Sequence, residues 1–219
     1  MLNELDALFY SETIKPTFDY VHIILALYIF GANPKGVGRY KLTEELTVGS
    51  GTAKSLINKL NEKINFISVS NEGIRKGHVL TQKGLNYLSK IKQKIPILNE
   101  GDVSALKEII IYPENTNPYY CQIKNASNKL TNGVEQRDAA IKVKGIGSTC
   151  LVYDGIKLIF KDPLGSFSET DRKQMNVSEN VQNYFKTLNL EKNDVIVIGF
   201  GKDTIKARLA ALNAALTLI

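Results

Sequence analysis

The most specific chemistry in this chain lies on a predicted helix from Thr52 to Lys63. Its apolar side chains recur at helical spacing, at Ala53, Leu56, Ile57 and Leu60. Because successive residues turn by about 100°, the opposite face carries short polar groups bordered by cations. These are Ser55, Asn58 and Glu62, with Lys54 and Lys59 at the borders. Hydrogen-bonding side chains between lysines suit nucleic-acid bases between phosphates, whereas the alternative is an ordinary solvated helix face.

Two basic clusters flank this helix in the sequence. Arg39, Tyr40 and Lys41 lie at the entry to a short predicted helix, where side chains and a helix N-terminus can hold a phosphate. The alternative is a surface strand. Arg75 and Lys76 lie in a glycine-bounded loop between two short predicted strands. This loop is either a contact to a nucleic-acid backbone or minor groove, or a solvated tip.

The elements that position these residues follow one another closely. The pattern predicts a buried first helix, a short strand, a short second helix, a tight turn with Ser50 as helix cap, the helix described above, a strand pair and a last helix. Apart from the helix already given, the ranges are Thr17–Phe30, Val37–Lys41, Leu42–Leu46, Phe66–Val69, His78–Thr81 and Gln82–Lys94. On so apolar a first helix, His22 is expected to be a structural histidine.

Positive charge is concentrated in this part of the chain. From Pro16 to Ile95 there are 12 lysines and arginines against five acidic residues, a net charge of +7. The whole chain carries +6, so the remainder carries −1. Such a distribution is the electrostatic footprint that binding to phosphates requires.

The second half of the sequence mixes strand and helix patterns, which predicts an α+β fold: two layers with a mainly antiparallel sheet. An Asp154-Gly155 turn indicates a hairpin within it. The predicted strands are Leu106–Tyr112, Tyr119–Lys124, Thr149–Tyr153, Lys157–Phe160 and Asp194–Ile198. The predicted helices are Val134–Val143, Ser168–Leu188 and Thr204–Leu218.

Two further motifs in this half have functional and structural interpretations. Gly199-Phe200-Gly201-Lys202 is either an anion-binding turn or a tight connection between a strand and a helix, and the structural interpretation is favoured because the phosphate-loop and dinucleotide patterns are incomplete. Arg137 and Asp138 either line an effector pocket or subunit interface, or form an exposed ion pair, which is the commoner fate of such charges.

The composition argues against several other classes of function. Cys121 and Cys150 lack metal-ligand spacing, and His22 and His78 both lie in the first half, so we expect no metal, no cofactor and no catalytic set. The longest apolar run, Val21 to Ala32, is too short to cross a bilayer. The expectation is a cytoplasmic protein that is not an enzyme.

Particular stretches of the sequence resemble known families. The run Gly38 to Leu46, the run Gly51 to Ala53 with Leu56 and Leu60, and the run Gly77 to Gly84 resemble prokaryotic winged-helix regulators. The second half resembles the partner domain of an archaeal family of two-domain winged-helix proteins of unassigned function. It does so at Arg137 to Lys142, Gly147 to Tyr153 and Asp194 to Gly199. In that family this domain is similar in fold to the insert domain of bacterial aspartyl-tRNA synthetases.

These resemblances imply a winged helix-turn-helix domain over residues 1–96 and an α+β domain over residues 100–219. The expected function is transcription regulation by binding double-stranded DNA. The expected interface comprises Arg39, Tyr40, Lys41, Thr52, Lys54, Ser55, Asn58, Lys59, Arg75 and Lys76. The second domain would mediate homodimerisation, sense a small-molecule effector, or both. Two alternatives stay open: an accessory protein of RNA or translation, and an interaction module that binds no nucleic acid.

Overall fold

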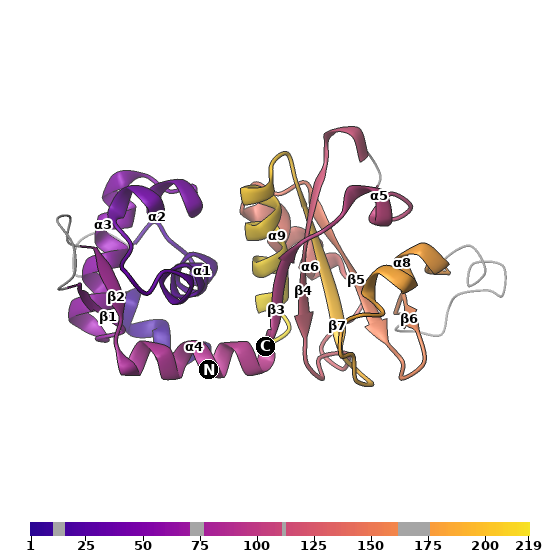
Figure 1. Cartoon of the computed structure of the whole chain (residues 1–219), viewed down its shortest axis with the longest axis horizontal. Helices are drawn as coiled ribbons and strands as arrows, with labels where there is room; N and C mark the ends of the chain where they lie inside the picture. The colour runs from indigo at the N-terminus through magenta and orange to yellow at the C-terminus, as the bar shows by residue number, and fades with distance from the viewer. Residues whose placement is uncertain (11–15, 71–76, 111–112, 162–175) are drawn as a thin grey trace. The chain divides into compact units, whose positions relative to one another are not determined.

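The computed structural model describes residues 1–10, 16–70, 77–110, 113–161 and 176–219. The chain divides into two compact units, Met1–Lys92 and Gln93–Ile219 (Figure 1). Each unit has its own buried apolar side chains. Together they combine helices with antiparallel sheets, so the predicted α+β class is confirmed. Within the described ranges, no helix combines the length and apolar character needed to cross a membrane.

The N-terminal unit is mainly helical, with one small sheet. Its elements are η1 (Leu2–Leu8), α1 (Tyr20–Ala32), α2 (Arg39–Glu45), α3 (Ser50–Asn58), the π-helical turn η2 (Lys59–Lys63), β1 (Ile67–Val69), β2 (His78–Leu80) and α4 (Gln82–Lys94). Helix α1 is buried along most of its length, as its apolar sequence predicts. The two strands pair antiparallel, with Ser68 opposite Val79.

The start of α1 explains His22. The backbone N–H of Asp19 donates to Nδ1 of His22 at 2.9 Å, and the two residues form a reciprocal capping box. Burial lowers the pKa of His22, although the neighbouring Asp19 opposes this shift. His22 is therefore a structural residue, as the sequence predicts.

Three local predictions in this unit are wrong. Only Val37 of the predicted strand Val37–Lys41 pairs, through an isolated bridge to His78, and α2 begins three residues earlier than predicted, at Arg39. The reason is that Leu42 and Leu46, one helical turn apart, are both fully buried. The N-cap of α3 is Gly49, which makes no side-chain cap, so Ser50 is the first helical residue and not the cap.

The C-terminal unit is built on a five-stranded sheet in the order β3-β4-β7-β5-β6, with every neighbouring pair antiparallel. The strands are β3 (Ile97–Glu100), β4 (Asn117–Ile123), β5 (Gly147–Tyr153), β6 (Leu158–Ile159) and β7 (Val195–Gly201). The helical elements are α5 (Val103–Leu106), η3 (Pro113–Asn115), α6 (Val134–Lys142), α8 (Glu179–Phe185) and α9 (Thr204–Leu216).

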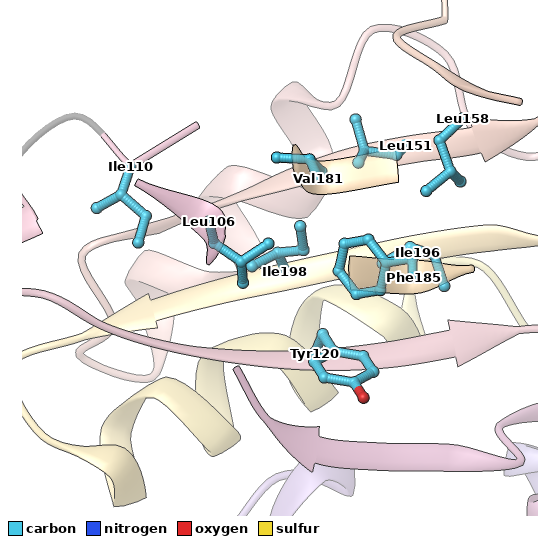
Figure 2. Packing of buried hydrophobic residues seen from close by; sticks show 9 residues of the cluster. All are labelled: Leu106, Ile110, Tyr120, Leu151, Leu158, Val181, Phe185, Ile196 and Ile198. Atoms are coloured by element: carbon cyan, nitrogen blue, oxygen red, sulfur yellow. The ribbon is translucent and has the colours of Figure 1, made fainter. Parts of the chain in front are cut away.

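Helices cover both faces of this sheet (Figure 1). The unit therefore has three layers, and the prediction of two layers is wrong. Helix α9 packs on β7 and β4, and α6 packs on α9 and β5. On the other face, Val181 and Phe185 of α8 and Leu106 of α5 pack against side chains from the strands (Figure 2). The strand residues in this cluster are Tyr120, Leu151, Leu158, Ile196 and Ile198.

The predicted strand Leu106–Tyr112 is wrong over its described part, because Val103–Leu106 is helical and a turn follows. The carboxylate of Asp102 accepts from the N–H of Ala105 at 2.8 Å, which caps this short helix. Strand β3 was not predicted. Of the predicted helix Ser168–Leu188, the described residues form α8 over Glu179–Phe185 only, and residues 168–175 lie outside the described ranges.

The β6 edge of the sheet is covered by the side chain of Gln182. Oε1 of Gln182 accepts from the N–H of Leu158 at 2.9 Å, and its Nε2 donates to the carbonyl of the same residue at 2.6 Å. Leu158 belongs to β6, the last strand of the sheet. Gln182 on α8 thus satisfies both backbone groups of Leu158 that point away from β5.

A buried polar cluster lies where β4 ends and β7 begins. The Asp194 carboxylate is 1% exposed and accepts four hydrogen bonds. The donors are Nε2 of Gln122 at 2.8 Å, Nζ of Lys124 at 2.9 Å, and the N–H groups of Asn125 and Glu191 at 3.0 Å each. The charge of Asp194 is therefore paired with Lys124 and stabilised by three further hydrogen bonds.

Candidate nucleic-acid interface

Helix α3 presents a polar face because its apolar residues are held in the core. Leu56 is fully buried and Ile57 is 6% exposed, and both lie on the predicted apolar side. On the opposite side, Lys54 and Asn58 are exposed and Ser55 is half-buried. Lys54 and Asn58 are four residues apart, so they lie one above the other on the helix surface. This face matches the prediction for these three residues.

Lys59 makes hydrogen bonds within the N-terminal unit. Its ammonium donates to the carbonyl of Leu8 at 2.8 Å and to the carbonyl of Tyr10 at 2.9 Å. These carbonyls come from the end of η1 and the residues after it. A lysine held by two carbonyls is part of the internal hydrogen bonding of this unit, so we remove Lys59 from the set of phosphate contacts.

Thr52, at the start of α3, also faces the N-terminal segment. Its Oγ1 lies 2.6 Å from Oγ1 of Thr17, and the two hydroxyls share a hydrogen bond. Thr52 and Lys59 are seven residues apart, so they lie on one flank of the helix. Leu8, Tyr10 and Thr17 therefore contact this helical region on the flank away from Lys54.

The first turn of α2 carries the predicted Arg39, Tyr40 and Lys41. Tyr40 is 78% exposed, and the guanidinium carbon of Arg39 lies 5.3 Å from the centre of its ring. This cation–π contact fixes an arginine beside an exposed aromatic ring. Lys41 Nζ donates to Oδ1 of Asn33 at 2.8 Å, and the Lys41 side chain is otherwise at the surface.

The hairpin after α3 brings the ends of a basic loop together. Val37 and His78 exchange backbone hydrogen bonds at 2.8 and 2.9 Å, and the N–H of Ser70 donates to the carbonyl of Gly77 at 2.8 Å. Arg75 and Lys76 lie between these ends, outside the described residues. Burial lowers the pKa of His78.

The motif Gly199 to Lys202 is structural. Gly199 and Gly201 lie in β7 directly under α9, where a Cβ on either would stand within 2.3 Å of the helix backbone. The N-cap of α9 is Asp203, whose carboxylate accepts from the N–H of Lys206 and binds its ammonium, both at 2.8 Å. A carboxylate at this position repels anions, so the glycines serve close packing.

Other candidate groups in the C-terminal unit are also accounted for. Arg137 donates to the carboxylate of Asp138 at 2.9 and 3.1 Å on an exposed surface, which confirms an ion pair. Burial raises the pKa of both thiols, to about 12 for Cys150 and further for Cys121. Among the described residues, no three His, Cys, Asp or Glu side chains are grouped closely enough to hold a metal.

The C-terminal unit also contains a cavity of about 740 Å³ beside α8. Its lining combines apolar, amide and charged side chains. Residues of this lining include Tyr153, Lys157, Gln182, Phe185, Lys186 and Leu190. Neither its position nor its lining was foreseen from the sequence, and Arg137 and Asp138 are not part of it.

Part of this chain matches a known protein family, and most of the chain is similar to a solved structure. Residues 114–218 match a family described as a domain of unknown function, DUF4443. A solved structure of a hypothetical protein from Pyrococcus horikoshii is similar over 92% of this chain and 93% of that one, with 22% sequence identity and a TM-score of 0.64. Among curated proteins the search found no match. These findings fit the predicted resemblance to an archaeal family of unassigned function.

Proposed function

We propose that the N-terminal unit is a winged helix-turn-helix that binds double-stranded DNA, and that the protein regulates transcription. The observation that carries this proposal is the exposed polar face of α3. That face is held outward by a buried apolar stripe, and its neighbours in the sequence are a short helix and two antiparallel strands. A helix presented in this way fits the major groove.

The charges of this unit support a phosphate-bearing partner. The net charge of +7 between Pro16 and Ile95 contrasts with −1 for the rest of the chain. In the proposed complex, Asn58 and Ser55 contact base edges, while Lys54, Arg39 and Lys41 contact phosphates. Tyr40 lies beside Arg39 and contacts the sugar-phosphate backbone. Arg75 and Lys76, which lie outside the described residues, are proposed to contact the DNA backbone or minor groove.

We further propose that the C-terminal unit mediates dimerisation, effector sensing or both. A homodimer would favour inverted half-sites about 34 Å apart, one turn of the double helix. The cavity beside α8 has a volume that suits a small molecule. Selection of bound duplexes from a random pool, followed by sequencing, tests the ligand class and the half-site symmetry together.

The two roles assigned to α3 predict different effects of substitution. Lys54→Ala should weaken binding to all duplexes alike and reduce the slope of log affinity against log salt concentration by about 0.9, because one phosphate contact is lost. Asn58→Ala should relax the preference at one base pair, by about 5- to 100-fold, with little change in that slope. Fluorescence anisotropy with selected and scrambled duplexes, at several salt concentrations, measures both effects.

The matched control is Lys129→Ala, an exposed lysine of the C-terminal unit that should leave affinity and slope unchanged. Equal losses for Lys54→Ala and Asn58→Ala, without a change in sequence preference, would contradict the assigned roles. Competition between random duplex DNA and total tRNA tests the alternative partner. Preferential binding of tRNA would replace the regulator with an RNA-associated protein.

A further inference from the structure

We propose that Tyr10 is an additional DNA contact, held beside the polar face of α3 by Lys59. This inference rests on the proposed function and names a residue outside the predicted interface. Lys59 becomes a positioning residue, because its ammonium binds the carbonyls of Leu8 and Tyr10 and acts on DNA through the segment that it holds.

The segment that leads to Tyr10 is firmly attached to the N-terminal unit. Leu5 and Leu8 of η1 are fully buried, and the hydroxyl of Tyr87 donates to the carbonyl of Met1 at 3.1 Å. The ring of Phe9 packs on that of Tyr20, with 4.7 Å between their centres. The backbone is thus fixed by packing up to the residue that precedes Tyr10, and Lys59 fixes the next carbonyl.

Hydrogen bonds place the Tyr10 carbonyl and the Thr17 hydroxyl on the same side of α3. Lys59 binds the Tyr10 carbonyl just beyond the C-terminal end of the helix, and Thr52 binds Thr17 at the N-terminal end. These two positions share one flank, and Lys54 lies on the opposite flank. Asn58 lies between the flanks. A duplex that contacts Asn58 would therefore meet the Lys54 side and the Tyr10 side together.

The chemistry of Tyr10 suits a sugar-phosphate backbone. Its side chain is 72% exposed, so the apolar ring has little cover from the unit itself. A phenol hydroxyl donates to phosphate oxygens, and the ring can pack on a deoxyribose. Such a contact is neutral and releases no counterion, which separates it experimentally from a lysine contact.

The test uses the full chain, a 30-base-pair random duplex and anisotropy at several salt concentrations. Tyr10→Ala should lower affinity by about three- to tenfold, as expected for one lost hydrogen bond and its packing, and should leave the salt slope unchanged. Tyr10→Phe keeps the ring but not the hydroxyl, so its affinity should lie between those of the wild type and Tyr10→Ala. Lys54→Ala is the matched charged control, and its slope should fall by about 0.9.

The positioning role of Lys59 is tested by a double-mutant cycle. Lys59→Met should lower affinity by the same factor as Tyr10→Ala, and the double variant should lose no more than either single variant. Lys59→Arg, which keeps the cationic donor, should recover part of the affinity. Circular dichroism and thermal melts identify variants that have lost the fold. If Tyr10→Ala or Lys59→Met is among them, the affinity of Tyr10→Phe is compared with that of the wild type: a lower affinity supports the hydroxyl contact, and an equal affinity contradicts it.

The outcomes separate this inference from the proposed function. Wild-type affinity in Tyr10→Ala, together with weakened binding in Lys54→Ala, would overturn the inference alone. Additive effects of Lys59→Met and Tyr10→Ala, with a slope reduced by about 0.9 in Lys59→Met, would show that Lys59 contacts phosphate directly and would also overturn it. Absence of duplex binding by the wild-type chain would overturn both proposals.

Discussion

Replacing Gly199 by alanine should destabilise the C-terminal unit by about 3 kcal/mol or more, because a Cβ has no space there. Built on Gly199, that atom would lie 2.1 Å from the backbone nitrogen of Ala211 and 2.5 Å from its Cα. Both neighbours are backbone atoms of α9, so they can move only if the whole helix shifts. Strand β7 is the central strand of the sheet, and a shift of α9 would also disturb its packing on β4.

Thermal unfolding followed by circular dichroism measures this effect, with an expected fall in midpoint of about 6–12 °C. The matched control is Gly147→Ala on the neighbouring strand β5. A Cβ at Gly147 would meet only Cγ of Arg137, at an ordinary 3.7 Å, so this variant should melt close to the wild type. Equal stability of the two variants would contradict the close approach of α9 to β7.

The second large effect is expected for Asp194→Asn. This change keeps the shape of the side chain but removes the buried charge that Lys124 balances, and one oxygen that accepts hydrogen bonds becomes an NH₂ facing donors. Breaking a pair whose carboxylate is buried and whose lysine is a quarter exposed should cost up to about 3 kcal/mol, which urea denaturation at pH 7 can measure. Asp138→Asn is the control, because its ion pair with Arg137 is exposed and its loss should cost less than about 0.5 kcal/mol.

The contribution of Asp194 should also depend on pH. Burial alone would raise the pKa of Asp194, but hydrogen bonds from the N–H groups of Glu191 and Asn125, and from Lys124 and Gln122, outweigh burial and lower it. A carboxyl whose pKa is lower in the folded state stabilises the fold above its unfolded value of about 4, and this stabilisation is lost as pH falls through the folded pKa.

The difference in unfolding free energy between wild type and Asp194→Asn should therefore be constant from about pH 5 to 7 and should narrow below about pH 4. Urea titrations at a series of pH values give this difference. A difference that stayed the same down to pH 2 would mean that the charge of Asp194 is not what stabilises the fold.

The parts of the fold that were predicted from the sequence are those with a local pattern. The stripe from Ala53 to Leu60 repeats at helical spacing, and the structure buries it as expected. Helix α9 and strand β7 are long, apolar and bounded by turn residues, and their predicted ranges differ from the observed ones by at most a few residues. The polar face of α3 follows from the same periodicity, so Lys54, Ser55 and Asn58 lie where predicted.

The features that could not be predicted depend on residues far apart in the sequence. Lys59 has the sequence context of an exposed cation, yet its partners are carbonyls about fifty residues earlier in the chain, at Leu8 and Tyr10. Strand β3 has only four residues and follows Pro96, so its pairing with β4 defines it more than its own composition does. Asp102 is a residue type that commonly caps a helix, and it does cap α5. The apolar run from Leu106 to Tyr112 nevertheless led to the prediction of a strand.

The hydrogen bonds between Gln182 and Leu158 protect the edge strand β6 from pairing with another strand. An uncovered terminal strand offers its free amide and carbonyl groups as a template on which a foreign polypeptide can add another strand, and this is a common route to aggregation. By occupying the N–H and the carbonyl of Leu158 at once, a single glutamine amide imitates the backbone of the missing neighbour. Growth of the sheet past β6 is thereby discouraged without the cost of building another strand.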